Sequence, residues 1–162
     1  MEDDFIFDNI THFDSTIINK FLIDNIDNKI SFYLGTIPFI FIPYSKYIYR
    51  GIVNIYTHSV VFTKKLRDDI LNYNYTHIFC WDTFQNFFNY NKYYYHIPLC
   101  FQLIEETENS INWPVFPLIR TLWFKIVYLL KANIKPQIFF QIIYLISYIL
   151  SILFFIILIY IL

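Results

Sequence analysis

A long apolar run without a charged residue closes the sequence and constrains it most. Residues 138–162 contain Gln141, Ser147, Ser151 and three tyrosines as their only polar members. About 20 apolar residues cross a bilayer as a helix, and soluble helices are rarely apolar on all faces over so many turns. The run therefore predicts one transmembrane helix over residues 137–162, which Pro136 can begin at its first turn.

The remaining residues suffice for one modest domain in a chain of 162 residues. Its short runs of β-branched and aromatic residues predict strands, separated by Asn and Asp. We expect a small, mainly β (α+β), mainly antiparallel domain over residues 1–118, followed by a juxtamembrane segment over residues 119–136. The predicted strands are Ile30–Leu34, Phe39–Ile42, Ile52–Phe62, His77–Trp81, Tyr93–Leu103 and Val115–Leu118.

Two helices are expected within this domain. Asp14 or Ser15 can cap a helix whose apolar residues recur every three or four positions up to Ile26. A second short helix is predicted over Lys64–Leu71. The segment Trp113–Leu130 can be a strand followed by a helix that lies on the membrane, because its tryptophans and Tyr128 suit the interface.

Charge and glycine content exclude several function classes. The net charge is −1 and the 12 basic residues are scattered, so no basic stripe is available to neutralise nucleic-acid phosphates. The two glycines, Gly35 and Gly51, cannot form a glycine-rich phosphate loop. We expect no catalytic residues, no cofactor and no enzyme activity. The acidic cluster Glu105, Glu106 and Glu108 is interpreted as a solvated loop rather than as acid/base groups.

Two pairs of potential zinc ligands, His77 with Cys80 and His96 with Cys100, lie in predicted strands. Residues three apart on a strand face opposite sides, and residues four apart are separated by about 13 Å. This spacing argues against a metal site, and we expect buried thiols instead. If the domain is lumenal, Cys80 and Cys100 can form a disulfide on neighbouring strands.

Features of the sequence disagree about the side of the membrane on which the N-terminal domain lies. Arg120, Lys125, Lys131 and Lys135 precede the span, and the positive-inside rule then places the domain in the cytoplasm. The acidic start, Met1–Asp4, resembles no signal sequence. In contrast, Asn9-Ile10-Thr11 and Asn74-Tyr75-Thr76 are possible N-glycosylation sites at Asn9 and Asn74, which would make the chain a lumenal glycoprotein.

One stretch carries a family resemblance. Tyr93–Leu103 reads YYYHIPLCFQL, an aromatic strand entering an Ile-Pro-Leu step, and an acidic loop and Ile111–Phe116 follow it. This order resembles the class X (PIG-X) proteins of GPI-anchor biosynthesis. Ile37-Pro38 and Pro43-Tyr44 resemble an upstream stretch of that family. The family's His, Arg and Tyr positions hold Cys100, Gln102 and Leu103 here.

The resemblance implies a non-catalytic, single-pass subunit of the endoplasmic reticulum membrane. Such a subunit stabilises the multi-span mannosyltransferase that adds the first mannose to the GPI precursor, GPI mannosyltransferase I. The alternative, from another class, is a tail-anchored membrane protein whose cytoplasm-facing domain binds a partner protein. In both interpretations the partners are a membrane and a protein, and no nucleic acid.

Overall fold

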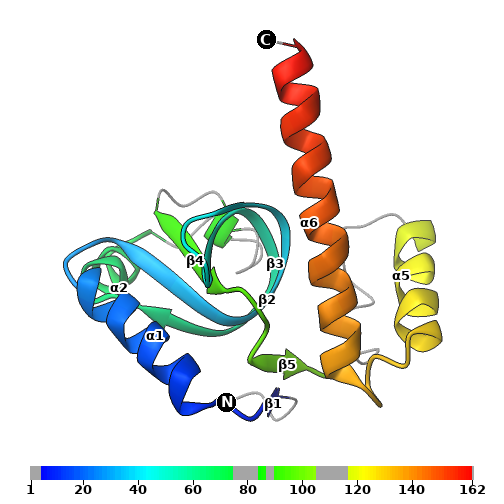
Figure 1. The fold of residues 1–162 in the computed structure, drawn as a ribbon, viewed down its shortest axis with the longest axis horizontal. Coiled ribbons are helices and arrows are strands. Elements are labelled where there is room, and N and C mark those ends of the chain that lie inside the picture. The colour runs from blue at the N-terminus through cyan, green and yellow to red at the C-terminus, as the bar shows by residue number, and fades with distance from the viewer. Residues whose placement is uncertain (1–4, 75–83, 87–89, 105–116, 162) are drawn as a thin grey trace.

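A computed structural model describes residues 5–74, 84–86, 90–104 and 117–161 (Figure 1). Helices and strands are mixed along these ranges, and the last helix is the longest. The elements, in chain order, are β1 (Phe5–Phe7), α1 (His12–Asp24), β2 (Ile30–Pro43), β3 (Ile48–Phe62), α2 (Lys64–Leu71), β4 (Asn91–Tyr95), β5 (Cys100–Gln102), α5 (Pro117–Leu129) and α6 (Pro136–Ile161).

Strands β2, β3 and β4 close into a small barrel. β2 and β3 form a long antiparallel hairpin, and β4 pairs parallel to the start of β2 and antiparallel to the start of β3. Register shifts occur on both sides of Pro38. Such irregularities bend a strand and increase its twist, which the two long strands require to close. Pro38 thus occupies an irregular point of β2, where a strand tolerates proline.

Helix α1 covers one side of the barrel. Its Ile18 and Phe21 pack against Phe32 of β2 and Tyr93 of β4 in a buried cluster. The Phe21 ring centroid lies 5.4 Å from that of Phe32 and 5.0 Å from that of Tyr93. Aromatic packing at these distances adds to the free energy gained from burial alone. The cluster therefore fixes α1 on the barrel.

The start of α1 differs from the prediction. Thr11, rather than Asp14 or Ser15, is the N-cap, and Asp14 is the third helical residue of a capping box. The Asp14 backbone N–H donates to Thr11 Oγ1, while the Asp14 carboxylate accepts from the Thr11 backbone N–H at 3.0 Å. Tyr95 also donates its hydroxyl to Asp14 at 2.8 Å. The carboxylate is thus buried inside the first turn, and the helix ends at Asp24, before Ile26.

The strands also differ in detail from the sequence pattern. Ile30–Leu34 and Phe39–Ile42 belong to one continuous strand, and Tyr93–Leu103 is divided into β4 and β5 by the bend at His96–Pro98. β5 pairs with β1 in a separate two-stranded sheet. Pro117 and Leu118, expected in a strand, begin α5. The expected strand His77–Trp81 lies outside the described residues.

The fold class is α+β with one long C-terminal helix. Helical residues make up 48% and strand residues 28%, so the prediction of a mainly β domain is not supported. The excess of helix comes from the C-terminal part of the chain, where α5 contributes 13 residues and α6 contributes 26. The short helix over Lys64–Leu71 is confirmed as α2.

Removal of the N-cap tests this account of α1. Thr11→Ala should lower the free energy of unfolding of the detergent-solubilised chain by about 1 kcal/mol, because a helix-capping acceptor is lost. Thr16→Ala is the matched control, since Thr16 only bonds the His12 carbonyl within the same helix. Denaturant titration of both variants gives the comparison, and equal losses would contradict the role of Thr11.

The same variant should respond to pH. The Thr11 side chain, opposed by burial and supported by Tyr95, lowers the pKa of the Asp14 carboxyl. A lowered pKa gives stability that is present above about pH 4 and lost as the pH falls through the folded-state value. The difference between wild type and Thr11→Ala should therefore shrink between pH 6 and pH 3. A difference that grows in acid would refute this linkage.

Candidate membrane anchor and the groove beside it

Helix α6 has two parts with different surroundings (Figure 1). The part up to Ser151 packs on the barrel, with α5 beside its beginning, and the part beyond Ser151 extends away from both. From Ile152 to Ile161 large apolar side chains on all sides of the helix are exposed. Among the described residues, α6 is the one helix long and apolar enough to cross a membrane. The predicted C-terminal span is therefore present as a helix of suitable length and composition.

One face of α6 packs on the barrel, and we call this contact the α6 seam. Its buried helix residues are Phe139, Phe140, Tyr144, Ser147 and Ser151. On the barrel side, Tyr33, Phe41 and Tyr94 share a cluster with Tyr144. The Tyr94 and Tyr144 ring centroids are 6.0 Å apart, edge to face. The seam is thus mainly aromatic.

Ser151 supplies the main polar contact of the α6 seam. Its hydroxyl accepts a hydrogen bond from the Phe41 backbone N–H at 3.0 Å and donates to the Ser147 carbonyl at 2.8 Å. In a transmembrane helix, residues such as Gln141, Ser147 and Ser151 can bond within the helix or to a partner helix. Ser151 does bond within the helix, but its second partner is a strand. Gln141 is exposed on another face.

Helix α5 packs against the start of α6. Val127 and Ala132 join Phe139 and Phe140 in a buried cluster, and the Trp123 and Phe139 ring centroids are 6.0 Å apart. The opposite face of α5 exposes Leu118, Leu122, Tyr128 and Leu129. Within the segment expected to be a strand and then a membrane-lying helix, residues 117–129 are helical. Residues 113–116 lie outside the described residues.

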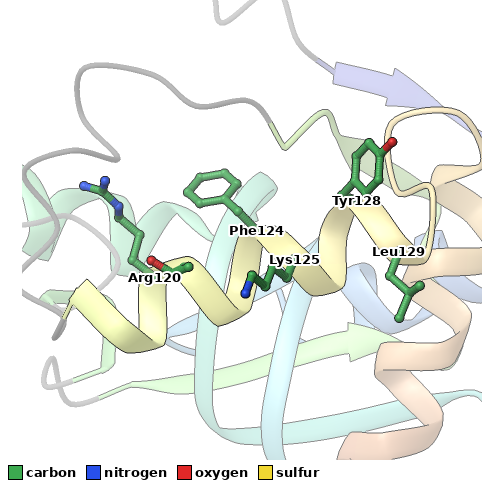
Figure 2. A pocket seen from close by; sticks show the side chains of 6 residues that line it. Arg120, Phe124, Lys125, Tyr128 and Leu129 are labelled. Atoms are coloured by element: carbon green, nitrogen blue, oxygen red, sulfur yellow. The ribbon is translucent and has the colours of Figure 1, made fainter.

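Two open hollows run along α5 and form what we call the α5 groove. The first, of about 480 Å³, is shown in Figure 2. The second, of about 800 Å³, lies at the turn between α5 and α6. They share Phe124, Tyr128 and Leu129, and the cations Arg120, Lys125 and Lys131 lie around them. Apolar walls with cationic rims suit an amphiphilic segment or a lipid with an acidic group.

Asn133 holds the turn between α5 and α6 against the rest of the domain. Its side chain accepts from the Ile104 backbone N–H at 2.8 Å and donates to the Ile104 carbonyl at 2.9 Å. These two bonds imitate the pairing of a neighbouring strand just beyond β5. Sequence analysis did not single out Asn133, because in an Asn-rich chain one more Asn beside a helix carries no distinguishing signal.

The possible glycosylation sites lie near described elements. Asn9 and Asn74 are both exposed, Asn9 just before α1 and Asn74 beyond the end of α2. Thr11, the acceptor-motif threonine after Asn9, donates its hydroxyl to Asp14 at 2.6 Å. Thr76 lies outside the described residues. Whether either site carries a glycan stays a prediction.

The predicted disulfide and metal ligands are only partly described. Cys100 begins β5 and is buried, and burial raises the pKa of its thiol. His96 is half-buried between the rings of Tyr47 and Tyr95, and burial lowers its pKa. His77, Cys80 and Glu105, Glu106 and Glu108 lie outside the described residues, so the Cys80–Cys100 pairing stays a prediction. The described ranges contain no group of three or more His, Cys, Asp or Glu side chains placed to hold a metal.

The barrel also buries polar residues that sequence analysis missed. Lys92 of β4 is 6% exposed, and its ammonium lies 4.9 Å from the Tyr90 ring centroid. Burial, and then the nearby Arg50, lower the pKa of Lys92. The buried Asn54 side chain lies so close to Gly51 that an added Cβ would be 2.5 Å from its Oδ1. Gly51 is therefore needed for close approach. None of these residues differs in sequence context from an ordinary strand residue.

Comparison with known proteins leaves the chain without an assigned relative: no family model, no curated protein and no solved structure matches it.

Asn133→Ala should release the turn between α5 and α6, because both bonds to Ile104 are lost and a backbone donor and acceptor lose their partners. The expected cost is about 1–3 kcal/mol, with faster tryptic cleavage at Lys131. Ile134→Ala is the control, since Ile134 is 74% exposed. Time courses of limited proteolysis compare the two, and equal rates would contradict the clamping role of Asn133.

Proposed function

We propose that this chain is a non-catalytic, single-pass subunit of the endoplasmic reticulum membrane that stabilises GPI mannosyltransferase I. The observation that carries a membrane function is the exposure of large apolar side chains on all sides of α6 from Ile152 to Ile161. A surface of this kind is unfavourable in water and favourable in hydrocarbon. An anchored domain with the apolar walls of the α5 groove fits a subunit that binds a membrane protein.

The finer assignment rests on the resemblance to the class X proteins. The resembling residues Tyr93–Leu103 cover the last three residues of β4, which belongs to the barrel, and all of β5, which pairs with β1. In the proposed complex the α5 groove and the exposed face of α6 meet helices of the multi-span partner. Gln141, exposed on α6, is a polar residue that can bond to a partner helix in the membrane.

A second candidate is a tail-anchored protein with a cytoplasm-facing, protein-binding domain. Two observations favour it. Lys131 and Lys135 are exposed beside the start of α6, where the positive-inside rule places the cytoplasm. In addition, the hydroxyl of Thr11, which belongs to one glycosylation motif, is bonded within the cap of α1. The cytoplasmic partner would then use the same α5 groove.

Topology separates the two candidates. N-terminally tagged protein in microsomes is treated with endoglycosidase H and, separately, with protease. A mobility shift that Asn9→Gln with Asn74→Gln abolishes, together with a protected tag, supports the lumenal subunit. An unglycosylated protein with a protease-sensitive tag supports the tail-anchored alternative.

Depletion tests the partner. Loss of the chain should lower the amount of the mannosyltransferase and of GPI-anchored proteins at the cell surface, because an unpartnered membrane subunit is degraded. Re-expression of the full chain should restore both. Normal surface GPI proteins in depleted cells would reject the assignment to this enzyme.

The anchor itself is tested by adding charge. Ile149→Lys with Ile152→Lys should move the chain from the carbonate-resistant to the carbonate-soluble fraction, since each lysine near the middle of a span costs about 2.5–3.5 kcal/mol. Both side chains are exposed and outside the α6 seam. The matched control, Ile26→Lys with Ile134→Lys, adds the same charge at exposed positions outside α6. Unchanged carbonate resistance of the α6 variant would argue against a spanning helix.

A further inference from the structure

The α6 seam and a membrane span require the same residues. A span needs about 20 helical residues, and every window of 20 residues within Pro136–Ile161 contains Tyr144, Ser147 and Ser151. These three residues are buried against the barrel. The part of α6 that would lie in hydrocarbon is therefore, in the described arrangement, partly covered by a β domain.

The barrel cannot accompany these residues into the bilayer. If the span occupies the last 20 residues of α6, Ser151 lies about 13 Å inside the hydrocarbon at ~1.5 Å per residue. Phe41, bonded to Ser151, would lie at the same depth. The hairpin that carries Phe41 also carries the exposed Ser45, Lys46 and Arg50. Exposed charges and irregular backbone are not tolerated in contact with lipid.

We propose that the barrel is an intramolecular cover for α6, and that the α6 seam opens when the helix enters the membrane. This inference rests on the proposed membrane anchoring. Outside the bilayer, Tyr33, Phe41 and Tyr94 shield one face of an otherwise exposed apolar helix. In the spanning state lipid replaces them, and the barrel face is free for the partner's surface.

The polar groups of the α6 seam suit reversible docking. The Ser151 hydroxyl donates to the Ser147 carbonyl within the same helix, so it keeps that bond when the helix is in lipid. Opening the seam deprives the Phe41 N–H of its acceptor, but this group then meets water at the barrel surface. The small serines also allow close approach to β2. A leucine at position 151 would suit a helix in lipid, but it would offer no acceptor to the Phe41 N–H in the docked state.

Disulfide trapping tests the cover. Phe41→Cys with Ser151→Cys is placed in a Cys80→Ala, Cys100→Ala background, with epitope tags at both ends. The chain is translated with and without sealed microsomes and oxidised with copper-phenanthroline. Ile42→Cys with Arg50→Cys is the matched control, because these residues are paired across β2 and β3 and stay paired in either state.

If the barrel covers α6 outside the membrane, the disulfide between positions 41 and 151 should form as efficiently as the control disulfide. It should do so only in translations without microsomes. In carbonate-resistant chains whose tags lie on opposite sides of the membrane, the link should fall at least tenfold while the control is unchanged. An undiminished link in spanning chains would overturn the cover and leave the anchor intact. If both tags lie on the same side of the membrane and carbonate extracts the chain, the anchor and the cover are overturned together. If the control disulfide forms without microsomes but the disulfide between positions 41 and 151 does not, docking of α6 on the barrel is overturned.

A second pair of variants separates docking from hydrophobicity. Ser151→Leu and Gln141→Leu make α6 similarly more apolar, but only Ser151 lies in the α6 seam. In membrane-free translation, Ser151→Leu should increase chymotryptic cleavage within α6 several-fold, whereas Gln141→Leu should not. Equal cleavage of both variants would overturn the role of the seam.

Discussion

The burial of β2 on both faces is the constraint on which the rest of the structure depends. Ile30 and Phe32 face the cluster beneath α1, whereas Tyr33, Ile37 and Phe41 belong to clusters that include α6. A strand covered on both sides requires apolar residues almost throughout, and residues 30–38 are buried with one half-buried exception. Helices α1 and α6, distant in sequence, are thus held in place by one strand.

The short strand β4 completes this arrangement through aromatic residues. Tyr93 and Tyr95 point to the α1 side, and Tyr94 points to the α6 side. Burial, assisted by its tyrosine neighbours, raises the pKa of Tyr94, so its hydroxyl stays neutral. Tyr95 adds a direct link to the cap of α1 through Asp14. Three consecutive tyrosines therefore connect both helices to the barrel, which explains why this stretch stands out in the sequence.

Sequence patterns predicted some features and missed others for identifiable reasons. The helix Lys64–Leu71 was predicted from Lys and Asp residues paired four positions apart, and the structure confirms it. The α1 start was placed three or four residues late, at Asp14 or Ser15, because Asp14 resembles a cap and is instead the capping-box partner of Thr11. Asn133, Lys92 and the Phe41–Ser151 bond depend on residues far apart in the chain. No local pattern distinguishes them.

The sequence by itself determined that residues from Pro136 onward form a long apolar helix, because that conclusion needs only the number of consecutive uncharged residues. Local propensity also indicated that Ile30–Leu34, Phe39–Ile42 and Ile52–Phe62 are extended, but not that the first two belong to one strand. Only the tertiary structure decided that β2 lies between two helices and that Ser147 and Ser151 face a strand. The physical reason is that propensity and periodicity act over a few residues, whereas packing joins side chains more than a hundred residues apart.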